Sequence, residues 1–442
     1  MERRGGGCLP ITVWLCGLFI AEPAGAADCN GNGVDDDRDL RPSRLGFKRV
    51  QEFALGDSPY AVTAADLDGD GDLDLATANY GAGADPARTV SVLWNEGGGK
   101  FSLPAFLVGG IGPRSVAAAD LDGDGDRDLV TANQFTKDLS IHWNEGVRRF
   151  APPMGIAAGD FPDSVAPADL DGDGALDLVV SMDDETAVKL YLNRGRAAWI
   201  LRQTVPGGRA QTPADLDGDG DLDLIGLAGG VAHVTFNRGN AAFGTPVRVG
   251  PSGPYSFALT RDLDRDGDVD LALGGRELAV LFNQGDGKFA RAVNYPKEGW
   301  LAAADVDRDG DTDLLLAHQR GLDGVELLRN DGLGMFAEAG SVPFSFHGMA
   351  FEAADLDGDG FPEIVETDGQ HLLAAANLGD GTFGPTYRIG VRYHPHTLAA
   401  ADLNGDGRMD LAMASYEALS LFLNDGNGTL GDPAHHQVEV HG

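Results

Sequence analysis

The sequence Ala65-Asp66-Leu67-Asp68-Gly69-Asp70-Gly71-Asp72-Leu73-Asp74-Leu75 places carboxylates at alternate positions around a central glycine. Five acids within nine residues repel one another. Each pair about 4 Å apart costs roughly 1 kcal/mol in water, and more where solvent is excluded. A folded loop with this sequence therefore requires a cation. All the available ligands are hard oxygens, which favours Ca²⁺.

The order of residues in the loop predicts a role for each position. The side chains of Asp66, Asp68 and Asp70, at positions 1, 3 and 5, supply oxygens to the ion. Gly71 at position 6 allows the sharp turn, and position 7 offers its backbone carbonyl. Asp74 at position 9 completes the shell.

The same loop occurs eight times, at intervals of 43 to 54 residues. Position 7 is Asp in five copies and Ala, Phe or Arg in the others, as expected if only its backbone oxygen binds the ion. Position 3 is once Asn and position 9 once Glu, and both are oxygen donors. The predicted metal ligands are, copy by copy, Asp66, Asp68, Asp70, Asp72 and Asp74; Asp120, Asp122, Asp124, Asp126 and Asp128; Asp169, Asp171, Asp173, Ala175 and Asp177; Asp215, Asp217, Asp219, Asp221 and Asp223; Asp262, Asp264, Asp266, Asp268 and Asp270; Asp305, Asp307, Asp309, Asp311 and Asp313; Asp355, Asp357, Asp359, Phe361 and Glu363; Asp402, Asn404, Asp406, Arg408 and Asp410.

The acidity of the chain follows from these loops. The net charge is -36 over 442 residues, and the eight loops alone contain 36 acidic residues. Eight bound Ca²⁺ ions would leave a charge of about -20. So negative a chain is repelled by nucleic acid and by an anionic membrane surface, and neither is expected as a partner. The repeats extend over most of the chain, which predicts one closed array rather than several domains.

The N-terminus has the pattern of a secretory signal peptide over residues 1–26. Arg3 and Arg4 precede an apolar run, and Ala24-Gly25-Ala26 provides a cleavage site. The run is shorter than the ~20 residues of a membrane span, and no later stretch reaches that length. We therefore expect a soluble, secreted protein that retains Cys29 as its one cysteine and so forms no internal disulfide.

Residues 27–45 read as an acidic linker. From Asp28 to Asp39 the linker is similar to an EF-hand calcium loop, but Asp39 stands where a bidentate Glu is usual. Two interpretations stay open for this segment, a calcium site and a solvated acidic linker.

Each repeat also contains short strands divided by turn signals, for example Val116–Ala119, Leu129–Ala132, Leu139–Trp143 and the segment from Phe150. Four strands per repeat predict a β-propeller blade. Third strands end in Asn-x-Gly, followed six residues after the Asn by a residue, usually aromatic, that we expect to pack between blades. These pairs are Asn95 and Phe101, Asn144 and Phe150, Asn193 and Trp199, Asn237 and Phe243, Asn283 and Phe289, Asn330 and Phe336, Asn377 and Phe383, and Asn424 and Leu430.

Phe47 precedes Asp66 by the same 19 residues that separate several of these aromatics from the next loop. The segment beginning at residue 46 is therefore predicted to be an outer strand that completes the last blade and closes the ring. The fold expected over residues 46–442 is all-β, a single propeller with eight four-stranded blades. The segment Leu430–Val440 is a second candidate for the closing strand, which leaves a seven-bladed ring with a displaced terminal repeat as the alternative.

The Asp-x-Asp-x-Asp-Gly-x-x-Asp loop, with its downstream Asn-x-Gly and Phe, resembles the FG-GAP/VCBS repeats of integrin α-subunit propellers and of secreted bacterial proteins. The resemblance covers roughly residues 46 to 430 and implies calcium in the hairpin between the first two strands of each blade. It also implies that ligands bind on the opposite face. Partner binding of the integrin kind is not implied, since leg domains and a membrane span are absent.

A second set of candidates stands just before each expected inner strand, where the propeller brings residues near the axis. They are Tyr60, Arg114, Asp163, Arg209, Tyr255, Trp300, His347, His394 and His396. Aromatic, cationic and imidazole groups together suit a glycan or protein ligand, although exposed loops also carry such residues without binding anything.

Two functions follow, and we prefer the first: a monomeric secreted calcium-binding module for adhesion or ligand binding, or a polysaccharide lyase on the same fold. Pure scaffolding is a third reading. The sequence contains none of the familiar catalytic motifs, and no catalytic residue is assigned.

Overall fold

The computed structural model describes residues 45–426 except 56–57, 82–88, 184–186, 197, 207, 211–212, 290–291, 319–323, 343, 345–350, 368–370, 392–394 and 416–417. The predicted signal peptide, the 28–39 loop, Cys29, His347, His394 and Leu430 lie outside these residues. Of Arg209 and His396 only the backbone is described, in strands β14 and β30.

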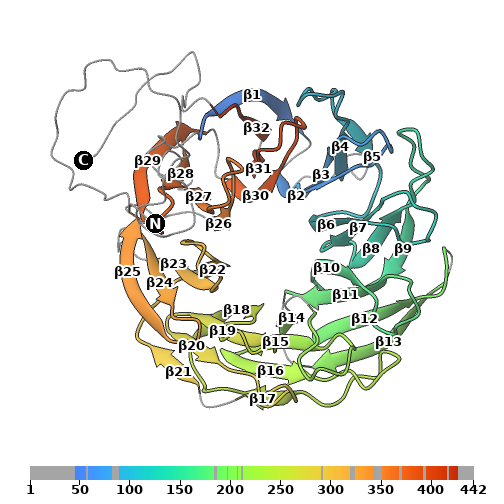
Figure 1. The fold of residues 1–442 in the computed structure, drawn as a ribbon. Helices are drawn as coiled ribbons and strands as arrows, with labels where there is room; N and C mark the ends of the chain where they lie inside the picture. The colour runs from blue at the N-terminus through green and yellow to red at the C-terminus, as the bar shows by residue number, and fades with distance from the viewer. Residues whose placement is uncertain are drawn as a thin grey trace, which may run out of the picture.

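The described residues form eight four-stranded antiparallel sheets, without a helix, arranged as blades around a central axis (Figure 1). Blades 1 to 4 are β2 (Pro59–Ala65), β3 (Asp74–Asn79), β4 (Val90–Leu93) and β5 (Ala105–Leu107); β6 (Pro113–Ala119), β7 (Asp128–Asn133), β8 (Asp138–His142) and β9 (Met154–Ala157); β10 (Pro162–Ala168), β11 (Asp177–Met182), β12 (Ala187–Asn193) and β13 (Trp199–Pro206); β14 (Arg209–Ala210), β15 (Leu224–Ala228), β16 (Val231–Thr235) and β17 (Val247–Val249). Blades 5 to 8 are β18 (Tyr255–Arg261), β19 (Asp270–Gly275), β20 (Leu278–Leu281) and β21 (Val293–Tyr295); β22 (Trp300–Ala304), β23 (Asp313–Ala317), β24 (Val325–Asn330) and β25 (Phe336–Val342); β26 (Phe351–Ala354), β27 (Glu363–Thr367), β28 (His371–Asn377) and β29 (Phe383–Gly390); β30 (Pro395–Ala401), β31 (Asp410–Ser415), β32 (Ala418–Asn424) and β1 (Phe47–Ala54).

The last blade is completed from the other end of the chain. Strand β1 pairs antiparallel with β32, with Phe47 opposite Asn424 and Ala54 opposite Ala418, and the two strands lie side by side in Figure 1. The predicted closure and the eight-bladed count are confirmed, and the seven-bladed alternative is wrong. Leu45, placed at the end of the linker by the sequence, is fully buried beside Phe47 in the cluster between blades 7 and 8.

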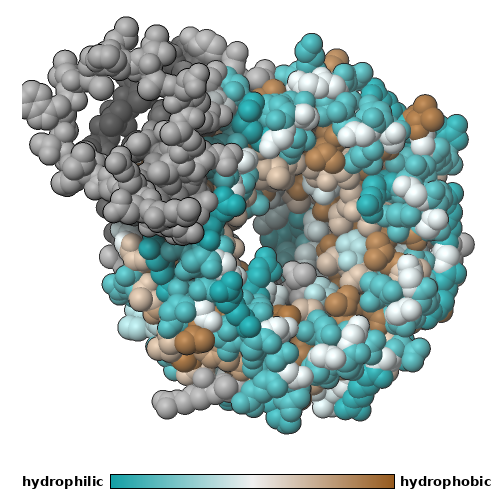
Figure 2. All heavy atoms as spheres, in the orientation of Figure 1, coloured by the Kyte–Doolittle hydropathy of each residue, from teal (hydrophilic) through white to brown (hydrophobic). Residues whose placement is uncertain are grey.

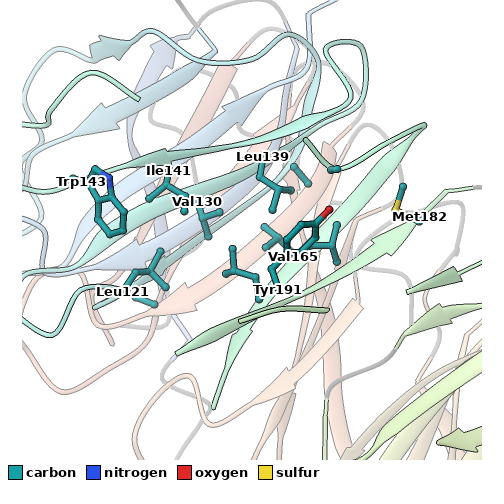
Figure 3. Close-up of a cluster of buried hydrophobic side chains, with 13 residues drawn as sticks. Leu121, Val130, Leu139, Ile141, Trp143, Val165, Met182 and Tyr191 are labelled. Carbon is teal, nitrogen blue, oxygen red and sulfur yellow. The ribbon is translucent and has the colours of Figure 1, made fainter. Parts of the chain in front are cut away.

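Buried side chains form eight clusters, each between two neighbouring blades. Between blades 2 and 3, for example, Leu139 and Ile141 of β8 meet Val165 of β10 and Tyr191 of β12 (Figure 3). In the seven turns whose aromatic the structure describes, this residue packs between blades as predicted. Phe101 of blade 1 joins the cluster with blade 8. The hydrophobic effect therefore acts between blades, because a single blade has no partner for its faces.

The two ends of the inner strands define two faces. The face that carries the acidic loops between first and second strands is called the loop face, and the other is called the opposite face. Figure 2 shows that the ring is hollowed at its centre.

Candidate functional site

The acidic loops are folded by their own side chains. In blade 1, Asp66 Oδ1 and Oδ2 accept hydrogen bonds from the backbone of Gly69 and Gly71, at 2.8 and 3.1 Å. Asp68 Oδ1 and Asp70 Oδ1 accept bonds from the residues two positions on. Gly71 has a φ of 94°, a conformation that glycine adopts without strain. The alternate carboxylates thus shape the loop as well as charging it.

The position-9 carboxylate is buried and joins the loop to the third strand. In blade 1, Leu67 N donates to Asp74 Oδ2 at 2.9 Å and Asn95 N donates to Asp74 Oδ1 at 2.7 Å. The corresponding bonds in the other seven blades measure 2.7 to 3.4 Å. This side chain therefore has a structural role besides the metal role that the sequence predicts.

Burial raises the pKa of these carboxyls. The pKa of Asp74 rises from 3.8 to about 6, because desolvation exceeds the effect of the two backbone hydrogen bonds, which lower it. The pKa of Asp313 and of Asp410 rises to about 7, and that of Glu363 to about 9, with desolvation again the largest cause. A nearby cation would favour the charged form of each group and oppose this effect.

The Asn of each Asn-x-Gly turn links two blades, which sequence reasoning missed. Asn144 Nδ2 donates at 2.7 Å to the carbonyl of Leu67 in the preceding blade and at 3.0 Å to that of Arg127 in its own loop. The first of these bonds recurs in all eight blades at 2.5 to 2.8 Å, and Asn95 closes the circle by donating to Leu403 of blade 8. The exact recurrence of this buried Asn was the signal available in the sequence.

The acidic residues fit a hard divalent cation. In blades 2 to 5, one oxygen from each of positions 1, 3 and 9 lies within 4.8 Å of the others, and blade 1 gathers positions 1, 3 and 5 in the same way. Buried oxygens without a hydrogen-bond partner remain at position 3, on Asp171, Asp217, Asp264 and Asp307. Such atoms are costly unless an ion or water satisfies them, and carboxylate oxygens are the ligands that Ca²⁺ prefers.

On the opposite face, the structure brings three predicted residues together. Arg114 Nη2 donates to the hydroxyl of Tyr60 at 2.8 Å, and Arg114 Nη1 lies 3.1 Å from Asp163 Oδ1 and 3.2 Å from Asp183 Oδ2. Burial lowers the pKa of Arg114, but the bond to Tyr60 and the two carboxylates outweigh burial and raise it. One guanidinium thus connects blades 1, 2 and 3.

Aromatic rings extend this network. Tyr80 lies 5.6 Å from Tyr60 and 5.2 Å from Phe135, centroid to centroid, and its hydroxyl donates to Gln134 at 2.6 Å. Phe135 is 49% exposed. We call Tyr60, Tyr80, Arg114, Gln134, Phe135, Asp163 and Asp183 the aromatic–arginine cluster.

Four members of this cluster were not predicted: Tyr80, Gln134, Phe135 and Asp183. They follow the second strand of a blade. Because neighbouring strands are antiparallel, the end of the second strand lies beside the start of the first. Residues just after the second strand therefore lie on the same face as residues just before the inner strand, and both positions are candidates for a ligand site.

Two other predicted ligand residues pack inward. Tyr255 is buried in the cluster between blades 4 and 5. Trp300 packs against the cluster of blades 6 and 7, and its ring centroid lies 4.2 Å from that of Phe257. The structure does not join either residue to the aromatic–arginine cluster.

A hollow of about 710 Å³ lies on the opposite face between blades 5 and 6, lined by Arg276, Lys297, His318, Glu326 and Glu338 among others. Lys297 pairs with Glu326 and with Glu338, and hydrogen bonds to both raise the pKa of the lysine. His318 Nε2 lies 3.4 Å from Glu326 Oε2. Lys297, Glu326 and Glu338 thus satisfy one another's charge, whereas His318 Nδ1 is buried without a hydrogen-bond partner.

Comparison with known families agrees with this geometry. The FG-GAP-like repeat matches residues 79–131, 120–180, 215–273, 262–316, 305–366, 367–413 and 402–440, and the FG-GAP repeat matches residues 58–93. The chain belongs to the FG-GAP repeat proteins. No match is found among curated proteins.

Two similar solved structures, with TM-scores above 0.5, share the propeller fold of this FG-GAP protein. Sqt1 from Chaetomium thermophilum is 11% identical, with a TM-score of 0.57 over 86% of this chain and 99% of that one. The V. cholerae biofilm matrix protein Bap1 is 13% identical, with a TM-score of 0.53 over 88% and 92%. An Agrocybe aegerita lectin that recognises non-reducing terminal N-acetylglucosamine is 20% identical, with a TM-score of 0.46 over 86% and 98%.

Proposed function

We propose that this FG-GAP propeller is an exported, calcium-stabilised binding module whose ligand, a glycan or a protein segment, docks on the aromatic–arginine cluster. The observation that carries the proposal is the convergence of Tyr60, Tyr80, Arg114, Phe135 and Asp183 from three blades on one face. Aromatic surface beside fixed polar groups is the usual composition of a small-ligand or peptide site.

The exposed face of Phe135 offers a flat apolar surface for a sugar ring or an apolar side chain. Arg114 is held by Asp163 and Asp183, so the group has one more negative than positive charge. A neutral ligand therefore suits this cluster better than an acidic one.

In a loop that binds calcium, the ion would be held by the side chains at positions 1, 3, 5 and 9 and the carbonyl at position 7, and would supply the positive charge that the clustered carboxylates lack. The orphaned oxygens of Asp217, Asp264 and Asp307 support this assignment. Release of metal would then lower stability through the unneutralised repulsion.

Export is proposed from the signal-peptide pattern of residues 1–26. FG-GAP repeats are typical of extracellular proteins. In the part of the chain that the structure describes, no helix has the length and apolar character of a membrane span.

The test is a screen of the chain lacking residues 1–26 against neutral and acidic glycans and a peptide library, followed by titration of the best binder. Phe135→Ala should weaken binding about tenfold, the effect of losing about 1.4 kcal/mol of stacking. Leu103→Ala is the control, since Leu103 is 86% exposed in the connection between β4 and β5, away from the cluster. Equal affinity of the two variants would place the site elsewhere.

The same screen tests the lyase alternative. Cleavage of an acidic polysaccharide, detected as new unsaturated ends, would identify an enzyme. Binding without cleavage supports the binding module.

A further inference from the structure

In blade 1, an arginine lies on the carboxylates that are predicted to bind calcium. Arg148 Nε is 2.6 Å from Asp68 Oδ2, at position 3 of the loop, and Arg148 Nη2 is 4.0 Å from Asp70 Oδ2. The guanidinium also pairs with Glu96 and lies 5.5 Å from the centroid of the Trp94 ring. The side chain of Asp68 is only 6% exposed, whereas that of Arg148 is 34% exposed.

Blade 2 has the same arrangement. Arg196 pairs with Asp122, again at position 3, and its Nη2 is 3.2 Å from Asp124 Oδ2 at position 5. Arg196 lies 5.4 Å from the centroid of the Trp143 ring.

In blade 3, Arg194 Nη2 is 2.6 Å from Asp171 Oδ2 at position 3, and Arg194 Nη1 is 2.9 Å from Asp173 Oδ2 at position 5. Three neighbouring loops therefore hold a fixed positive charge that is supplied by the protein.

Arg148 and Arg196 come from the Asn-x-Gly turn of the following blade, which covers position 3 of the loop before it, whereas Arg194 comes from the turn of its own blade. Arg148 stands four residues after its Asn, where blade 5 has Gly287 and blade 7 has Gly381. A Cβ on Gly287 would lie 3.2 Å from Asp217 Cβ, and one on Gly381 would lie 3.0 Å from Asp307 Cβ. Arg148 keeps the glycine-like φ of 61°, so it occupies the same backbone position with a long cationic side chain added.

Blades 4 and 5 are different. Asp217 Oδ1 and Asp264 Oδ1, at position 3 of their loops, are buried and have no hydrogen-bond partner. Among the residues that the structure describes, no arginine or lysine pairs with the acids of these two loops.

We propose that the ring binds calcium unequally: blades 4 and 5 are tight sites, whereas Arg148, Arg196 and Arg194 take the place of the ion in blades 1, 2 and 3. This proposal rests on the calcium binding put forward above. To bind Ca²⁺, blades 1, 2 and 3 must first displace a guanidinium that is paired with the carboxylates at positions 3 and 5. Blades 4 and 5 have no such cation to displace, and the ion would supply a partner for an orphaned oxygen.

The experiment counts tight ions by titrating the metal-free chain lacking residues 1–26 with Ca²⁺ alone, in competition with a chromophoric chelator. Asp68→Asn and Asp217→Asn alter the same loop position in blades 1 and 4. Asp217→Asn should remove one tight ion, and Asp68→Asn should leave the number of tight ions unchanged.

Arg148→Gly should do the opposite and add one tight ion, raising the affinity of that loop about tenfold or more. It restores the glycine that other blades carry, so it keeps the turn conformation. Arg149→Ala is its control, because Arg149 is 76% exposed and pairs with Glu145 in its own turn.

If both Asp→Asn variants lose one tight ion and Arg148→Gly gains none, the unequal binding is overturned while calcium binding stands. If the unaltered chain binds no Ca²⁺ at all, both proposals fail.

Discussion

The two faces of the propeller differ in how regularly their contacts recur from blade to blade. On the loop face, every blade repeats the same hydrogen bonds between position 9, the turn Asn and the preceding blade. On the opposite face, the described residues of blades 1, 2 and 3 form one network around Arg114, and blades 5 and 6 form another around Lys297. Bonds that recur in every blade stabilise the ring, whereas groups that occur in only a few blades are available for a specific ligand.

The largest effect is expected from breaking one hydrogen-bonded link between a turn Asn and the preceding blade. Asn144→Ala leaves the carbonyls of Leu67 and Arg127 and the N–H of Gly146 without the Asn144 side chain. Each unsatisfied buried group costs about 1–3 kcal/mol, so the free energy of unfolding should fall by about 3 kcal/mol or more. Denaturant titration in saturating calcium measures this change. Asn294→Ala, at an exposed position in β21, is the control, and equal loss in both variants would show that the links do not hold the ring.

The next largest effect expected on the loop face is a dependence of stability on pH, caused by the buried position-9 carboxyls. The pKa of Asp313 and Asp410 is raised to about 7 and that of Glu363 to about 9 in the folded chain. The folded state then binds more protons than the unfolded state, so its stability decreases as pH rises through these values. In chelator, the thermal midpoint should be higher by a few degrees at pH 6.5 than at pH 8. Below pH 6.5 a second group contributes with the opposite sign. Burial lowers the pKa of His142 to about 4, so its contribution to stability decreases as pH falls.

Saturating calcium should flatten this dependence, because the ion favours the charged carboxylates at both pH values. If the thermal midpoint in chelator is lower at pH 6.5 than at pH 8, the proposed effect of burial on the position-9 carboxyls is contradicted.

The smallest expected effect lies within one loop. Asp221, at position 7 of blade 4, should contribute only its backbone carbonyl, whereas Asp219 at position 5 should contribute its side chain. Asp219→Ala should lower the calcium affinity of this loop about tenfold or more, and Asp221→Ala much less. Calorimetric titration of both variants compares them, and equal losses would show that the ligand scheme is wrong.

Much of the loop face was predictable because its signal is local and repeated. The spacing of acids and glycines within nine residues gives each loop, eight copies give the blades, and the position of Phe47 gives the closing strand. The links of the turn Asn were not predictable in the same way, since Asn144 and its partner Leu67 are 77 residues apart.

The opposite face was predicted less well. Location just before an inner strand was enough to predict Tyr60, Arg114 and Asp163 as residues of the opposite face. The same criterion did not distinguish them from Tyr255, which packs into the core. Side-chain direction depends on how neighbouring blades pack, and that information is spread over residues far apart in the sequence.

The closing pair of strands has a consequence for how the chain reaches its fold. Gly46 N donates to Asn424 Oδ1 across 378 positions of sequence, so β1 has to wait for nearly the whole polypeptide to be synthesised before its partner strand exists. Contacts between such distant residues form slowly, because the entropy of ordering the intervening chain is lost first. Until β30, β31 and β32 have all emerged from the ribosome, β1 has no partner strand and blade 1 has no complete blade 8 beside it. The ring is therefore expected to close in a late step, after the middle blades have begun to stack on one another.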